Sequence, residues 1–253
     1  MKMKRFLFLT IIFFPVFVAT VSAQKNQKVE PVMTAVKPEA PTDISFYEKT
    51  YHMAMNYNDL VAATQSVYQI LSVDSSSVAW RDTLASLFLM RGAYEQAVFV
   101  GKQLLDKQPG DVRLEELVAI SLQSLGDAKQ SLEYYDKLYP KTKNLYHLYQ
   151  IIVLQYSLAR LGECTNSIDQ LVADERSDKE QVDINVGQNY TQKVPYKAAA
   201  LNIKGVIAKQ LNDVATAEKL FNEALKVYPD FVLPKGNLED LKKPKDDKTP
   251  VNK

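Results

Sequence analysis

The stretch that decides the fold is Ala198–Pro229, AAALNIKGVIAKQLNDVATAEKLFNEALKVYP. Small residues stand at Gly205 and Ala217, where the backbones of two packed antiparallel helices must approach closely. Phe221 stands where a ring can fill the space between successive helix pairs, and Pro229 ends the second helix because proline cannot continue it. The pattern therefore predicts two short antiparallel helices with a tight turn between them.

This combination of small, aromatic and proline positions resembles the tetratricopeptide repeat (TPR), a helix–turn–helix unit of 34 residues. The resemblance implies a right-handed α-solenoid in which each unit packs on its neighbours. It also implies that the first helices of successive units line a concave groove where partner polypeptides lie. The expected function is that of a non-enzymatic protein–protein interaction adaptor or scaffold.

The same pattern recurs at this period towards the N-terminus, with turns at Asn58-Asp59, Gly92 and Gly126-Asp127. A fourth unit begins near Leu148, and its turn is expected at Gly162-Glu163. We therefore predict an all-α solenoid of about five TPR helix pairs, with units near 44–77, 78–111, 112–147, 148–180 and 198–231, closed by a capping helix over 232–241.

An insertion with a different hydrophobic periodicity separates the fourth unit from the last. Val182, Ile184 and Val186 alternate with polar residues, Gly187 can form a turn, and alternation resumes after it. A period of two around a glycine predicts a β-hairpin over 181–195. Because a two-stranded ribbon is marginal alone, it must lie on the helices or on a partner.

Both ends of the chain differ from the body. Lys2, Lys4 and Arg5 precede an apolar run that ends in small residues at Ala23, which predicts a secretory signal peptide over 1–23. We expect export to the bacterial periplasm or cell envelope, with no stable membrane span after cleavage. Residues 24–43 and 242–253 contain proline and lysine without apolar periodicity, which predicts a disordered leader and tail.

Composition and motifs argue against most other functions. The 253 residues carry a net charge of +1, which does not favour nucleic-acid binding. One cysteine and two histidines provide few ligands for a metal site, and no cofactor is expected. Phosphate loops and hydrolase motifs are absent from the sequence, so we predict no enzymatic activity. Cys164 could pair with His147 as a nucleophile, but we interpret it as a small apolar filler.

The TPR resemblance places specific side chains on the groove. They are Ser45, Glu48, His52 and Met55; Ala79, Asp82, Ser86 and Leu89; Arg113, Glu116, Ile120 and Gln123; Tyr149, Ile152, Tyr156 and Ala159; and Ala199, Asn202, Val206 and Lys209. Glu48, Asp82 and Glu116 are 34 residues apart and are expected to form an acidic row that suits a basic partner segment. Three unrelated solvated acids remain the alternative.

The fourth unit carries a candidate patch, Tyr149, Ile152 and Tyr156, on a helix that is apolar on almost every side. Either the inserted hairpin covers this patch, or a partner polypeptide docks there. The partner is a protein or peptide that the sequence does not identify, and a homo-oligomer is an open alternative. A second function class is a binding module for a small molecule or glycan, which would require a deep closed pocket beside Tyr149.

Overall fold

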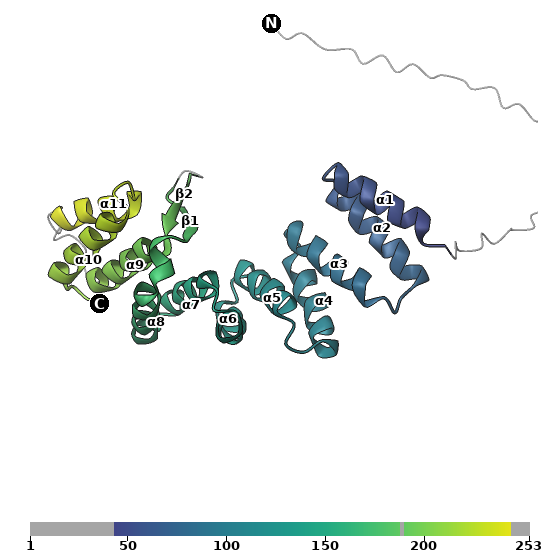
Figure 1. Cartoon of the computed structure of the whole chain (residues 1–253), viewed down its shortest axis with the longest axis horizontal. Helices are drawn as coiled ribbons and strands as arrows, with labels where there is room; N and C mark the ends of the chain where they lie inside the picture. Colours follow the sequence, from purple (N-terminus) through teal and green to yellow (C-terminus); the bar gives the residue numbers. More distant parts are fainter. Residues whose placement is uncertain (1–42, 188–189, 244–253) are drawn as a thin grey trace, which may run out of the picture. The chain divides into compact units, whose positions relative to one another are not determined.

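The computed structural model describes residues 43–187 and 190–243. The predicted signal peptide, almost all of the predicted leader and the chain after residue 243 lie outside the described residues. Figure 1 shows helices that follow one another in antiparallel pairs, and consecutive pairs pack on each other. The pairs are α1 (Ser45–Asn56) with α2 (Leu60–Val73), α3 (Val78–Met90) with α4 (Tyr94–Lys107), α5 (Val112–Ser124) with α6 (Ala128–Thr142), α7 (Leu145–Ser157) with α8 (Leu161–Ala173), and α9 (Tyr196–Gln210) with α10 (Val214–Val227).

Each pair turns at one residue in the left-handed backbone region. These residues are Asn58, Gly92, Gly126, Ala159 and Asn212, with φ between 54° and 81°. The turn of the fourth pair therefore lies at Ala159-Arg160, and Gly162 lies in the first turn of α8. The prediction of a turn at Gly162-Glu163 was wrong, because alanine in a left-handed position gives no turn signal in the sequence.

The residue after the turn often begins the second helix by capping its free N–H groups. Asp59, Asp127 and Asp213 each accept a hydrogen bond at 3.0 Å from the backbone N–H three residues ahead. A side-chain oxygen at this position satisfies a donor that has no partner inside the helix. In these three pairs, the turn and the cap together fix where the second helix starts.

Five residues after each left-handed residue stands a small, fully buried side chain. The five are Ala63, Ala97, Ser131, Cys164 and Ala217, each 0% exposed. The two polar ones make the same contact: Ser131 Oγ donates to the Ala119 carbonyl oxygen at 2.9 Å, and Cys164 Sγ donates to that of Ile152 at 3.4 Å. Cys164 therefore fills the alanine position of the fourth pair.

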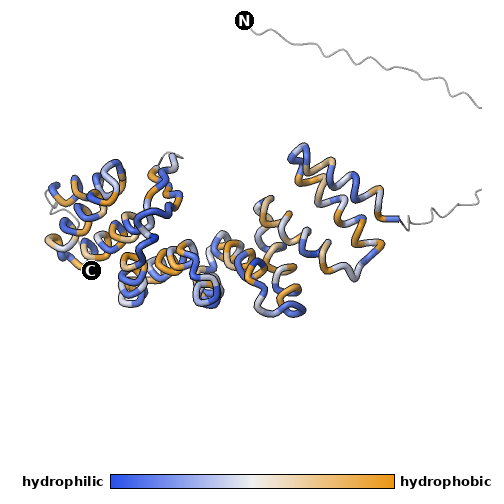
Figure 2. Tube along the Cα trace, viewed as in Figure 1, coloured by the Kyte–Doolittle hydropathy of each residue, from blue (hydrophilic) through white to orange (hydrophobic). Residues whose placement is uncertain are grey.

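The hydrophobic core lies between and within consecutive pairs. Figure 2 shows hydrophobic and hydrophilic residues interleaved along the helices, as expected for helices with one buried face. Buried leucines and alanines of α3, α4 and α5 form one continuous cluster with the inner face of the first pair. The pairs are thus held by apolar contacts with their neighbours, which is the stabilisation typical of repeat proteins.

The predicted β-hairpin is confirmed. Strands β1 (Gln181–Asn185) and β2 (Thr191–Pro195) pair antiparallel, with Gln181 opposite Pro195, and a short 3₁₀ helix, η1 (Glu175–Asp178), precedes them. Val194 of β2 is fully buried. Gln192 ties the ribbon to the last helix: its Nε2 donates to the Asp230 carbonyl oxygen at 2.7 Å, and its Oε1 accepts from the Val232 N–H at 3.2 Å.

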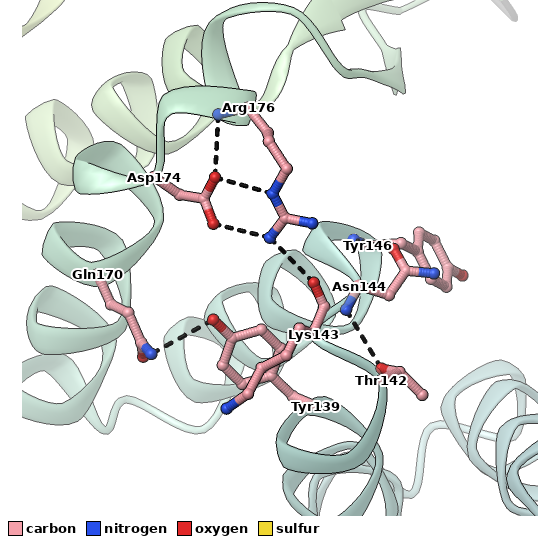
Figure 3. A network of polar contacts seen from close by, with 8 residues as sticks. All are labelled: Tyr139, Thr142, Lys143, Asn144, Tyr146, Gln170, Asp174 and Arg176. Atoms are coloured by element: carbon pink, nitrogen blue, oxygen red, sulfur yellow. Dashed lines mark hydrogen bonds and ion pairs between the residues drawn. The ribbon is translucent and has the colours of Figure 1, made fainter.

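Polar contacts fasten the start of the insertion to the fourth pair (Figure 3). Arg176 Nη2 donates to the Lys143 carbonyl oxygen at 3.0 Å and also forms an ion pair with Asp174. Hydrogen bonds from Arg176 hold the pKa of Asp174 below its ordinary value. Gln170 Nε2 of α8 donates to the Tyr139 hydroxyl of α6 at 3.3 Å, which adds a second polar contact between the third and fourth pairs.

The last helix, α11 (Val232–Lys242), lies on the fifth pair. Leu238 and Leu241 pack against the buried cluster of α9 and α10. Within the described residues, every helix is too short or too polar to cross a membrane.

Candidate functional site

The left-handed turns set the register of the predicted groove. Counting back from each of them by ten, six and three residues gives one three-residue row on every first helix. The rows are Glu48, His52 and Met55; Asp82, Ser86 and Leu89; Glu116, Ile120 and Gln123; Tyr149, Val153 and Tyr156; and Asn202, Val206 and Lys209. Val153 takes the place of Ile152, because the fourth turn lies at Ala159, three residues before the predicted turn at Gly162.

A hollow of about 190 Å³ opens between α3 and α5, the first helices of the second and third pairs. Its lining consists of Ser86, Leu89, Arg113, Glu116, Leu117 and Ile120. Leu117 is the only one of these that the sequence analysis did not place on the groove. The hollow therefore combines three apolar side chains with a hydroxyl, a cation and a carboxylate.

Two acids of the predicted row, Asp82 and Glu116, have partners inside the chain. Arg113 Nη2 lies 2.6 Å from Asp82 Oδ2, and this ion pair joins α3 to α5. The buried His147 places its Nε2 3.3 Å from Glu116 Oε1 and its Nδ1 2.8 Å from Thr142 Oγ1. These contacts hold Arg113 and Glu116 at the edge of the hollow, where each still has atoms available to a ligand.

The tyrosine patch of the fourth pair is largely buried. Tyr149 is 7% exposed and Ile152 is fully buried. The ring of Tyr149 packs against that of Tyr196, the first residue of α9, with 5.7 Å between centroids. Burial raises the pKa of Tyr149, and it raises that of Tyr196 to about 12. Since Val194 joins the same cluster, the inserted segment covers this patch, and Tyr149 and Ile152 belong to the core.

Three further predicted groove residues of the fourth and fifth pairs, Tyr156, Asn202 and Val206, are also engaged. The Tyr156 hydroxyl accepts from Gln210 Nε2 at 2.6 Å. The buried Asn202 accepts at Oδ1 from Asn237 Nδ2 of α11 at 3.1 Å. Val206 is half-buried in the cluster that α11 completes. The hollow between α3 and α5 is therefore the better candidate for a free binding surface.

Cys164 and His147 are not paired with each other. Burial raises the pKa of the Cys164 thiol to about 11, and its Sγ contacts the carbonyl oxygen of Ile152. His147 is engaged with Glu116 and Thr142. A thiol without an activating base in an apolar site is a poor nucleophile. In the part of the chain that the structure describes, no group of three or more His, Cys, Asp or Glu side chains could hold a metal ion.

Sequence reasoning missed an exposed apolar face on the first helix pair. Phe46, Met53 and Tyr57 lie on one side of α1 and are 65%, 57% and 81% exposed. A hollow of about 400 Å³ lies beside them, between α1 and α2. The spacing of seven and four residues places the three on one helix face, which is the signal that could have found them.

Comparison with known proteins gives structural neighbours alone, since neither a family model nor a curated protein matches the chain. YrrB, described as a TPR protein with an unusual peptide-binding site, matches with a TM-score of 0.60 and 15% identity, over 78% of this chain and 93% of that one. A tetratricopeptide repeat protein from Parabacteroides merdae ATCC 43184 matches with a TM-score of 0.60 and 16% identity, over 78% and 72%. MamA from Desulfovibrio magneticus RS-1 matches with a TM-score of 0.58 and 11% identity, over 74% and 95%. Likeness at these identities shows a shared fold.

Proposed function

We propose that this chain, which has the tetratricopeptide-repeat fold, is a non-catalytic adaptor that binds a partner polypeptide along the first helices of its N-terminal units. The observation that carries the proposal is the hollow between α3 and α5. It lies on the first helices, at the positions that the repeat register assigns to the groove.

The chemistry of the hollow suits a peptide segment. Leu89, Leu117 and Ile120 offer an apolar floor for one side chain. Arg113 donates and Glu116 accepts hydrogen bonds at its edge, so both the carbonyl and the N–H of a peptide group could be satisfied. The peptide-binding site named in the description of YrrB supports the same class of partner.

The size of the hollow favours a polypeptide over a small molecule or glycan. A volume of about 190 Å³ falls below the roughly 300–1,000 Å³ of pockets that enclose drug-sized ligands. The tyrosine patch that would stack on a sugar ring is buried at Tyr149. An extended peptide can place one side chain in the hollow without a change in the backbone of this chain.

We also propose that the adaptor works in the bacterial cell envelope, on the strength of the signal-peptide pattern in residues 1–23. N-terminal sequencing of the protein purified from its own cells tests this part separately. A mature chain that begins at Gln24 is expected. A chain that retains residues 1–23 and fractionates with cytoplasmic proteins would contradict the location and leave the groove proposal standing.

Site-specific photocrosslinking tests the binding proposal. A photoreactive amino acid replaces Ile120 in the hollow, and a second variant carries it at Phe99 of α4, which is 64% exposed and belongs to a second helix. We expect Ile120 to capture a polypeptide that Phe99 does not capture. A synthetic peptide copied from the captured segment should then compete for the crosslink.

Two results would contradict the adaptor. One is equal capture of the same proteins from both positions, which indicates non-specific contact. The other is crosslinking at Ile120 to further copies of this chain alone, which would assign the groove to self-association.

A further inference from the structure

The first helix pair leaves one apolar face uncovered among the described residues. Phe46 and Met53 of α1, Tyr57 directly after it and Val61 of α2 are all more than half exposed. Met53 and Tyr57 lie on the wall of the hollow of about 400 Å³ between the two helices. A different face of α1 carries the groove row Glu48, His52 and Met55. The exposed apolar surface is therefore separate from the proposed groove.

The second pair shows what packs on the corresponding face. One repeat further along the chain, Met53 corresponds to Leu87 and Tyr57 to Arg91. Leu87 is 1% exposed, in the core that α3 shares with α2. Arg91 Nη1 donates to Thr64 Oγ1 of α2 at 3.1 Å. The occupant of this face inside the chain is therefore a helix with an apolar stripe.

The aromatic residue on the covering helix gives a second view of this packing. The ring of Tyr68 in α2 lies 6.5 Å from that of Phe88 in α3, centroid to centroid. One repeat earlier, Phe88 corresponds to Ala54 on the wall of the open hollow. The first pair thus presents a small residue and an empty space where the second pair fills the interface with a ring.

The charges around the face indicate the sign of the charge that its occupant carries. Asp59 borders the hollow, and Asp43 stands just before α1. Residues 43–77 carry four carboxylates and one amine, at Asp43, Glu48, Asp59, Asp74 and Lys49. Among the described residues, none of these four carboxylates forms an ion pair. An apolar face with acids near both ends is complementary to a basic partner.

We propose that this outer face of the first helix pair docks an amphipathic helix of a partner protein, whose apolar stripe is flanked by lysine or arginine. The stripe takes the place that α2 takes on α3, with one large side chain in the hollow beside Ala54. The basic residues lie near Asp43 and Asp59. With the groove between α3 and α5, the chain then has two docking surfaces of different kinds and can hold two partners at once.

The probe for this surface is a synthetic peptide of 14 residues, the length of α2, made of leucine, alanine and lysine with its leucines at i, i+3, i+4 and i+7. A matched peptide has glutamate in place of lysine. Fluorescence anisotropy measures binding of each labelled peptide to the full chain. We expect the lysine peptide to bind at least about tenfold more tightly than the glutamate peptide.

Variants locate the binding. Met53→Asp and Tyr57→Asp replace exposed side chains and should weaken the lysine peptide by about tenfold or more, while circular dichroism shows unchanged folding. Phe99→Asp, an equally exposed substitution on α4, should leave binding unchanged. Equal binding of both peptides, or binding that Met53→Asp leaves unchanged, would overturn the proposal.

Two other occupants are distinguished by the same variants. A dimer in sedimentation experiments that Met53→Asp dissociates would assign the face to a second copy of the chain. A lysine peptide that binds only after residues 24–42 are deleted would assign it to that segment. Either result overturns the proposal of a partner helix.

Discussion

The ring of Phe221 in α10 occupies the space that a side chain on Gly205 of α9 would need. A Cβ atom added to Gly205 would lie 2.5 Å from Cε1 and 2.7 Å from Cδ1 of Phe221. Phe221 is fully buried, so its ring has no room to withdraw. The packing of α10 on α9 at this point therefore requires a residue without a side chain at position 205.

This contact predicts that Gly205→Ala destabilises the chain by roughly 1–3 kcal/mol, the usual cost of overpacking a core. Gly162→Ala in α8 is the matched control, since nothing lies within 4 Å of its added Cβ atom. It should stabilise the chain by roughly 0.5–1 kcal/mol, because alanine favours the helix. Urea denaturation of both variants gives the comparison, and equal shifts in the same direction would contradict the packing described here.

The left-handed backbone at Ala159 predicts a stabilising substitution. Its φ of 54° is unfavourable for a residue with a Cβ atom and costs about 1 kcal/mol. Ala159→Gly should therefore raise the thermal midpoint, whereas Ala215→Gly at an exposed helical position of α10 should lower it. A lower midpoint for Ala159→Gly would show that the turn does not have this conformation.

Burial of Tyr149 predicts that its role is structural. Tyr149→Ala removes a ring that packs on Tyr196 and should destabilise the chain by about 3 kcal/mol or more. Tyr149→Phe keeps the ring, and the free energy of unfolding should change by less than about 1 kcal/mol. Denaturant titration and partner binding are measured side by side. A Tyr149→Phe variant that folds normally and loses the partner would return this residue to the binding surface.

The raised pKa of Cys164 predicts a loss of stability in alkali. The unfolded thiol ionises near its ordinary pKa of 9.0, whereas the buried thiol keeps its proton up to about 11. The stabilisation is therefore complete below pH 9 and is lost as the pH rises from 9 to 11, by roughly 2–3 kcal/mol in total. Cys164→Ser has no thiol to titrate, and its hydroxyl can take the bond that Ser131 makes in the third pair. Unfolding curves of the two proteins that fall in parallel over this pH range would contradict the prediction.

Much of the architecture could be predicted because three turns carry explicit signals. Asn58, Gly92 and Gly126 recur every 34 residues, and a small residue follows each of them at the same distance. The hairpin was also predictable, since alternation around Gly187 differs from helical spacing. These are local patterns, and the backbone chemistry behind them is the same wherever they occur.

The site was less predictable, because it depends on the exact register of each helix and on what covers each surface. The fourth turn lies at Ala159, three residues before the predicted turn at Gly162, and this difference moves Ile152 from the groove into the core. The burial of Tyr149 under Tyr196 follows from where the insertion folds. The 31-residue separation of Asp82 from its partner Arg113 does not match the repeat period, so periodicity did not indicate it.

Methyl-resolved NMR shows whether a partner polypeptide lies in the hollow between α3 and α5. The peptide identified by crosslinking is titrated into the full chain while the methyl groups of Leu89, Leu117 and Ile120 are observed, with the exposed Leu211 as the reference. We expect saturable shifts of the methyl groups of Leu89, Leu117 and Ile120 and none at Leu211. Saturable binding that leaves all three unshifted would contradict it.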